Sequence, residues 1–442
     1  MMMRMIRSAL AAATLLALPA LPALAAVEIQ EVKSEGGFTA WLVEEHTIPF
    51  VALELRFKGG ANLDPEGKRG AINLMTGLLE EGAGDLDARG FAEAREALAA
   101  SYDFDVYDDT LTISAQFLTE NRAEAVALLR KALVETRFDQ DAIDRVRAQV
   151  VSIIQSDEKD PNAIAARTFD ALAFGDHPYA TPRDGTLESI AALTREDMFE
   201  ARDRVIAKDR VYVGAVGDIT PEQLSELMDA LLSDLPETGA PPVPDAEYAL
   251  EGGVTVVPFP SPQSVVIFGH EGIKRDDEDF FAAYVMNQIL GAGGFSSRLM
   301  EEVREKRGLT YGISTFLVPM DHAETVQGQV ASSNETVAEA IEVIRAEWRR
   351  MAEEGVTEEE LRDAKTYLTG AYPLRFDGNG TIANIIVGMQ TQGLPIDYIA
   401  TRNDKVEAVT REDVARVAKR LLDADALHFV VVGQPEGLET TN

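Results

Sequence analysis

Leu193-Thr194-Arg195-Glu196-Asp197 decides the fold, because this stretch recurs as Val409-Thr410-Arg411-Glu412-Asp413. Each copy precedes a helical pattern and then an apolar strand that ends at a glycine, Gly217 or Gly433. The threonine hydroxyl caps free amides at a helix start, and the acidic residues suit the positive end of the helix dipole. Caps and strands repeat at one offset of 216 residues, from 194 to 410 and from 217 to 433. This regularity predicts two similar halves.

A proline-rich stretch from Leu235 to Pro244 interrupts the periodic sequence between these halves. Such composition is typical of an extended linker. We therefore expect an N-terminal domain over residues 26–235, a linker over 236–252, a C-terminal domain over 253–435 and a short tail over 436–442.

Residue patterns within the halves favour mixed structure. Val51 to Phe57 alternates apolar and polar residues, as a half-buried strand does, whereas Arg122 to Glu135 and Asp139 to Gln155 have helical spacing. We predict an α+β fold of two homologous domains, each an antiparallel-rich sheet with helices packed on one face.

Composition excludes several classes of protein. The 442 residues carry a net charge of −34, which disfavours nucleic acid and anionic membranes as partners, and they include no cysteine, which excludes disulfides and thiolate metal sites. Residues 1–25 combine early arginines, an apolar run and Ala23-Leu24-Ala25, the pattern of a secretory signal peptide. The apolar run is shorter than the ~20 residues of a spanning helix, so we expect a periplasmic mature chain without a membrane anchor.

The segment Lys68 to Gly82 is a helix directly after a glycine-ended strand. It resembles the position where pitrilysin/insulinase-type zinc metallopeptidases, the inverzincins, carry H-x-x-E-H. In that motif two imidazoles hold zinc while the glutamate polarises its bound water. Here the three positions fall on Asn73, Thr76 and Gly77, and none of these can do the work of the residue it displaces.

The family's third ligand is a glutamate on a later helix. Counting back from Asp160-Pro161 places that position at Ile153, which cannot bind a metal. The five histidines are widely separated along the chain, and no pair has the spacing of one helix face. For His177, before Pro178-Tyr179, a capping role is expected rather than a metal role. We expect no metal and no cofactor in this chain.

The run from Gly291 to Gly312 matches the signature of the family's C-terminal half. The resemblance implies that Arg304 and Tyr311, the latter on the following strand, project into the catalytic chamber and help bind substrate and its oxyanion. A guanidinium and a phenol are suitable donors for that charge. The ordinary alternative is that Arg304 pairs with a nearby acid such as Glu301 and that Tyr311 is a core aromatic.

Glycines at the start of this run, Gly291, Gly293 and Gly294, lack the lysine of a phosphate-binding loop and the spacing of a dinucleotide site. A glycine loop at a similar point aids substrate recognition in the non-catalytic subunit of the related mitochondrial processing peptidase. The resemblance implies such a substrate loop here, although this loop is shorter.

Loss of the zinc motif with retention of the Arg/Tyr pair resembles the non-catalytic subunit of heterodimeric bacterial members. There the partner subunit supplies zinc, and each chain forms half of a clamshell around peptide substrates. Two alternatives remain open: an inert scaffold or peptide-binding protein, and a self-sufficient peptidase with an unconventional metal site.

Overall fold

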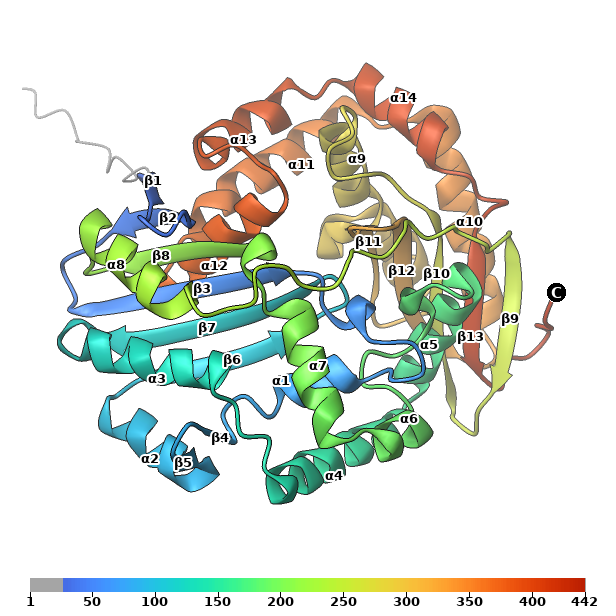
Figure 1. Ribbon diagram of the computed structural model, residues 1–442. Helices are drawn as coiled ribbons and strands as arrows, with labels where there is room; N and C mark the ends of the chain where they lie inside the picture. Colours follow the sequence, from blue (N-terminus) through green and yellow to red (C-terminus); the bar gives the residue numbers. More distant parts are fainter. Residues whose placement is uncertain (1–26, 442) are drawn as a thin grey trace, which may run out of the picture.

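The computed structural model describes residues 27–441, and its first half builds a six-stranded sheet in the order β1-β2-β8-β3-β7-β6 (Figure 1). Its strands are β1 (Gln30–Lys33), β2 (Thr39–Glu44), β3 (Phe50–Lys58), β6 (Ser101–Val106), β7 (Thr110–Leu118) and β8 (Val211–Gly217). All neighbours are antiparallel except β2 and β8. A separate two-stranded hairpin joins β4 (Gly82–Ala83) to β5 (Leu86–Asp87).

The second half builds a five-stranded sheet in the order β11-β12-β10-β13-β9. Its strands are β9 (Gly253–Pro258), β10 (Gln263–Glu271), β11 (Ile313–Pro319), β12 (Glu324–Ser333) and β13 (His428–Gly433). The only parallel pair in this sheet is β13 with β9, which matches the β2–β8 pair of the first half. The common order and the common parallel pair confirm the two homologous halves.

Helices surround both sheets. The first half contributes α1 (Ala71–Thr76), α2 (Ala88–Ala97), α3 (Arg122–Val134), α4 (Gln140–Asp157), α5 (Pro161–Phe174), α6 (Leu187–Ala192), α7 (Arg195–Val205) and α8 (Pro221–Leu232). The second contributes α9 (Phe280–Asn287), α10 (Val337–Glu354), α11 (Glu358–Ala371), α12 (Asn379–Thr391), α13 (Tyr398–Ala408) and α14 (Arg411–Leu421). Thr194 and Thr410 form capping boxes at the starts of α7 and α14, as the sequence predicts.

Two helices are exchanged between the halves. Helix α5 of the first half packs on β10 and β13, and α12 of the second half packs on β3 and β8 (Figure 1). Phe169 of α5 joins a buried cluster with Val430, while Ile386 of α12 joins one with Val216. Each half's own helices pack on one face of its sheet, as predicted. The other face is covered by a helix from the opposite half, which was not predicted.

The approach of α12 to the first sheet is close enough to require a glycine. A Cβ atom at Gly214 of β8 would lie 2.9 Å from the Ala383 carbonyl oxygen and 3.1 Å from Ile386 Cγ1. Because the Ala383 oxygen belongs to the backbone of α12, a side chain at position 214 would push α12 away from the sheet.

The halves are also joined by side chains and by the connecting segment. Tyr179 donates a 2.5 Å hydrogen bond to Asp109, whose other oxygen accepts from the Asp321 amide of the second half at 3.0 Å. The connecting segment has no helix or strand, and its Ala246 amide donates to the His322 carbonyl at 2.8 Å.

The predicted signal peptide, residues 1–25, lies outside the described residues. Within residues 27–441, no helix is both long and apolar enough to cross a membrane.

Helix α12 belongs to one half and packs on the other. A substitution that weakens the packing of α12 on the first sheet should therefore destabilise the whole chain. We expect Ile386→Ala, at a fully buried site, to lower the free energy of unfolding by about 2–4 kcal/mol. Urea denaturation should show one cooperative transition at lower urea. Exposed Thr381→Ala, on the same helix, is the control and should change little. Separate transitions for the two halves would contradict this interdependence.

Candidate functional site

Helix α1 carries the positions aligned with the family zinc motif. Asp64 fixes its start, because the Asp64 carboxylate accepts 2.8 Å hydrogen bonds from the Gly70 and Ile72 amides. Burial raises the pKa of Asp64 to about 6, against these hydrogen bonds and the charge of Arg69. Gly70 has a φ of 91°, a left-handed conformation that glycine adopts without strain.

The three motif positions are occupied by internal contacts. Asn73 Nδ2 donates a 2.8 Å hydrogen bond to Asp184 Oδ1. Thr76 is buried and its hydroxyl donates to the Ile72 carbonyl at 2.7 Å. A Cβ atom at Gly77 would lie 3.1 Å from Val146 Cγ1, so even the first atom of a histidine side chain would press on α4.

The fourth position, Ile153, lies on α4 with 49% of its surface exposed. An amide, a hydroxyl, a missing side chain and an aliphatic side chain do not make a zinc donor set. Across residues 27–441, no three His, Asp or Glu side chains gather closely enough to hold a metal ion. The residues present do not fit the family's zinc, and no step of the chemistry is assigned to a metal in this chain.

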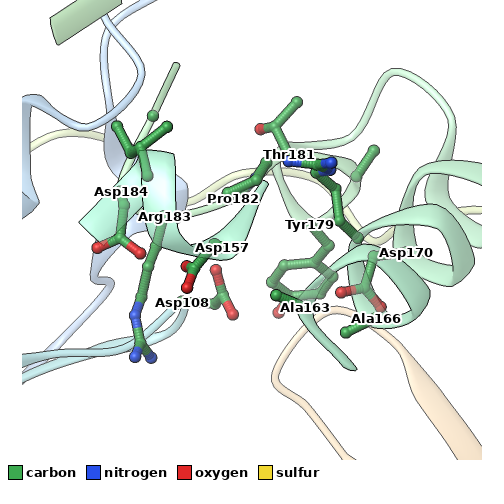
Figure 2. A pocket seen from close by; sticks show the side chains of 14 residues that line it. Asp108, Asp157, Ala163, Ala166, Asp170, Tyr179, Thr181, Pro182, Arg183 and Asp184 are labelled. Atoms are coloured by element: carbon green, nitrogen blue, oxygen red, sulfur yellow. The ribbon is translucent and has the colours of Figure 1, made fainter. Parts of the chain in front are cut away.

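A cavity of about 350 Å³ lies beside this region and is lined from α4, α5 and the loop before α6 (Figure 2). Its wall includes four carboxylates, Asp108, Asp157, Asp170 and Asp184. Burial, and secondarily the charge of Asp108, raises the pKa of Asp170 to about 7. The Asp184 carboxylate is held by Asn73. The cavity thus lies beside the positions of the metal motif. Its four carboxylates do not come close enough together to form a metal site among the described residues.

Two of the histidines meet in space although they are far apart in sequence. The rings of His177 and His322 lie 6.2 Å apart, and both flank Tyr179. His177 Nδ1 accepts from the Tyr179 amide at 3.2 Å, which confirms the capping role, and burial lowers the pKa of His177. Sequence spacing gave no signal for this contact, because it depends on the docking of the two halves.

Arg304 and Tyr311 occupy different settings in the second half. Arg304 lies in a π-helical turn, Met300–Glu305, where its Nη1 is 2.9 Å from Glu305 Oε1 and its guanidinium stacks 4.6 Å from the ring centre of Phe295. The ordinary alternative of an ion pair with a nearby acid is therefore observed for Arg304, with Glu305 in place of Glu301. Tyr311 precedes β11, not within it as expected, and 88% of its surface is exposed. Tyr311 is not a core aromatic.

The three glycines differ in their surroundings. Gly291 is buried in the π-helical turn Gln288–Ala292, and a Cβ atom there would lie 2.4 Å from Thr315 Oγ1, so this glycine permits close packing on β11. Gly293 follows that turn, and Gly294 has a φ of 57° and an exposed surface. The next residue, Phe295, is 73% exposed. Phe295 was not among the site residues predicted from the sequence, although an aromatic residue directly after Gly293-Gly294 was a signal for it.

The two-sheet fold and the replaced metal motif define a class of protein. A family profile described as "Insulinase (Peptidase family M16)" matches residues 40–186, and one described as "Peptidase M16 inactive domain" matches residues 192–368. The chain belongs to this M16 family, which confirms the resemblance to insulinase-type peptidases, and its second half matches the profile of the family's inactive domain.

Two relatives and one solved structure resemble the chain over most of its length. "Non-peptidase homolog YmxG" of Helicobacter pylori is 28% identical over 390 residues, covering 88% of this chain and 90% of that protein. "Uncharacterized zinc protease SCO5738" of Streptomyces coelicolor is 25% identical over 363 residues, covering 80% and 78%. The crystal structure of a "peptidase M16 inactive domain" from Pseudomonas fluorescens superposes with a TM-score of 0.87 at 26% identity, covering 93% of this chain and all of that one.

The raised pKa of Asp170 predicts a pH-dependent loss of stability. Between its ordinary pKa of 3.8 and about 7, the folded chain keeps a proton that the unfolded chain has lost, so stability falls as pH rises through this window. Asp170→Asn should therefore be more stable than the parent by about 1–3 kcal/mol at pH 8, with no difference near pH 3. Urea denaturation across pH measures this. Exposed Asp176→Asn is the matched control, and an Asp170→Asn effect independent of pH would contradict the assignment.

Proposed function

We propose that the chain is the non-catalytic subunit of a zinc-dependent peptidase and that it completes the active site of a zinc-bearing partner of the same family. Arg304 and Tyr311 are the residues assigned to this role. The support comes from the family match, the unsuitable donors at positions 73, 76, 77 and 153, and the setting of these two side chains.

Exposure of Tyr311 is the observation that carries the proposal. An aromatic residue with 88% of its surface exposed gains little from burial in its own chain, and its phenol has no hydrogen-bond partner among residues 27–441. Arg304 is stacked on Phe295 but has a single ion pair, which leaves most of its five donors available. Such groups fit a surface that is completed by a second molecule.

These residues have a definite chemical use in peptide hydrolysis. A guanidinium and a phenol both donate hydrogen bonds to a carbonyl oxygen, and they do so more strongly as negative charge develops on it. Neither can attack the peptide bond. Zinc in the partner would polarise the attacking water, while this chain would bind the substrate and hold its developing oxyanion.

The proposal extends to the substrate loop and to the location of the complex. Exposed Gly294 and Phe295 lie beside Arg304 at the surface, so this end of the glycine loop is assigned to peptide contact. The proposed location is the periplasm, because the signal-like N-terminus favours export. An inert scaffold is the second candidate, but a scaffold has no use for the exposed phenol of Tyr311.

Capture from a native periplasmic extract tests this function. We expect the mature chain, used as bait, to bring down a zinc-bearing protein of similar size and to yield hydrolysis of an unstructured peptide. Arg304→Ala should lower that hydrolysis about 100-fold while the partner still binds, because a transition-state donor is lost. Tyr311→Phe should also lower it.

Arg362→Ala is the matched control, since Arg362 is an exposed arginine on α11 that pairs with its own helix. It should leave both capture and hydrolysis unchanged. If the bait is metal-free and inert and captures no peptidase, the proposed function is contradicted and the scaffold is favoured. Full hydrolysis by the Arg304→Ala complex would remove Arg304 from the active site.

A further inference from the structure

A second cavity, of about 550 Å³, lies between α12 and the second sheet. Its wall is built from α9, α12, α13, β11, the turn Tyr372–Arg375 and the side chain of Arg56 from β3. Seven aromatic side chains contribute to it, namely Phe280, Phe281, Tyr284, Phe316, Tyr372, Phe376 and Tyr398.

The charge of this wall is opposite to that of the chain. Four arginines line the cavity, Arg56, Arg275, Arg375 and Arg402, and no Asp or Glu does. The chain as a whole has 75 acidic and 41 basic residues, so an acid-free wall with four guanidinium groups is not what its average composition would give.

These guanidinium groups are not neutralised within the chain. Among residues 27–441, none of the four has a carboxylate oxygen within the 4.0 Å of an ion pair. Arg275 instead stacks 4.2 Å over Phe280 and donates to the Tyr398 hydroxyl at 2.8 Å. Arg402 is buried and donates to the Leu368 carbonyl at 2.8 Å. Stacking and neutral acceptors hold the side chains in place but leave their positive charge unpaired.

Arg56 has the least compensation of the four. Its Nε atom is buried without a hydrogen-bond partner, and burial lowers the pKa of this arginine. Glu54, two residues away on β3, is the nearest interacting acid, but it makes no ion pair with Arg56. Burial also raises the pKa of Glu54 to about 7, so this neighbour supplies less than a full negative charge near neutral pH.

The arrangement favours a ligand with several negative charges. The four arginines come from four different segments of the chain, and Arg275 and Arg402 each stack on an aromatic ring of the same wall. Asn384 and Gln392 on the same wall offer amide groups of the kind that bind a peptide backbone. Guanidinium groups bind carboxylates in a bidentate manner, and the aromatic rings supply apolar contact.

We propose that this cavity binds an acidic peptide segment that carries an aromatic or aliphatic side chain beside its carboxylates. The site belongs to the isolated chain and does not rest on the partner or on the Arg304–Tyr311 pair. Its failure can therefore be told apart from failure of the proposed function.

Fluorescence anisotropy with the purified mature chain tests the site. The probe is a labelled peptide of Asp, Glu and Tyr residues, compared with the same peptide carrying Asn and Gln. We expect the acidic peptide to bind at least ~10-fold more tightly and to weaken as salt rises, since several charge contacts are lost and screened. Equal affinity of the two peptides, or no binding of either, would overturn the proposal.

Arg375→Glu is the decisive variant, because Arg375 is exposed and has no ion pair or side-chain hydrogen bond among residues 27–441, so the fold should survive its change. This substitution should lower the affinity for the acidic peptide at least ~10-fold. Arg89→Glu on α2, exposed and outside the cavity, is the matched control and should bind as the parent does. An unchanged Arg375→Glu affinity, or full displacement of the peptide by inorganic phosphate at equal concentration, would contradict an acidic peptide site.

Discussion

Each sheet of this protein has two apolar faces, and the helices of its own half cover only one of them. All six residues of β13 are buried, and in β8 every residue from Val213 to Gly217 is buried. Strands of this kind need cover on both sides, which the exchange of α5 and α12 provides. The exchange makes the halves mutually dependent, fixes the close contact at Gly214, and forces α12 across the space between the sheets. Helix α12 also forms part of the wall of the arginine-lined cavity, and Tyr179 belongs to the buried cluster around α5.

Many of the helices and strands could be predicted because they depend on local sequence patterns. The 216-residue repeat anticipated the paired capping boxes at Thr194 and Thr410 and the equivalent strands β8 and β13. The exchange was not predictable, since an amphipathic pattern shows that a face is buried but not what buries it. The family resemblance implied that Tyr311 lies on a strand, and this was wrong, because the strand begins at Ile313 and leaves the tyrosine exposed. An ion pair of Arg304 with a nearby acid was the ordinary alternative, and the structure shows it with Glu305 as the partner.

The metal-motif positions on α1 and the candidate substrate-binding residues of the second half differ in their exposure and contacts. Around α1, each position of the former metal motif is engaged inward: Asn73 holds Asp184, Thr76 bonds its own helix, and Gly77 makes room for Val146. In the second half, Tyr311 and Phe295 are exposed, with Arg304 stacked against the latter. Contacts within the chain thus occupy Asn73 and Thr76, whereas Tyr311 and Phe295 remain exposed to another molecule. This contrast is the physical basis for assigning the chain a completing role in place of a catalytic one.

Titration of the zinc-bearing partner with this chain tests that role most directly. Purified partner is held at fixed concentration while peptide hydrolysis is measured against increasing amounts of this chain. The account predicts a nearly inactive partner alone, an inactive chain alone, and hydrolysis that rises and saturates at one chain per partner. Full hydrolysis by the partner without this chain, or hydrolysis by this chain without the partner, would contradict it.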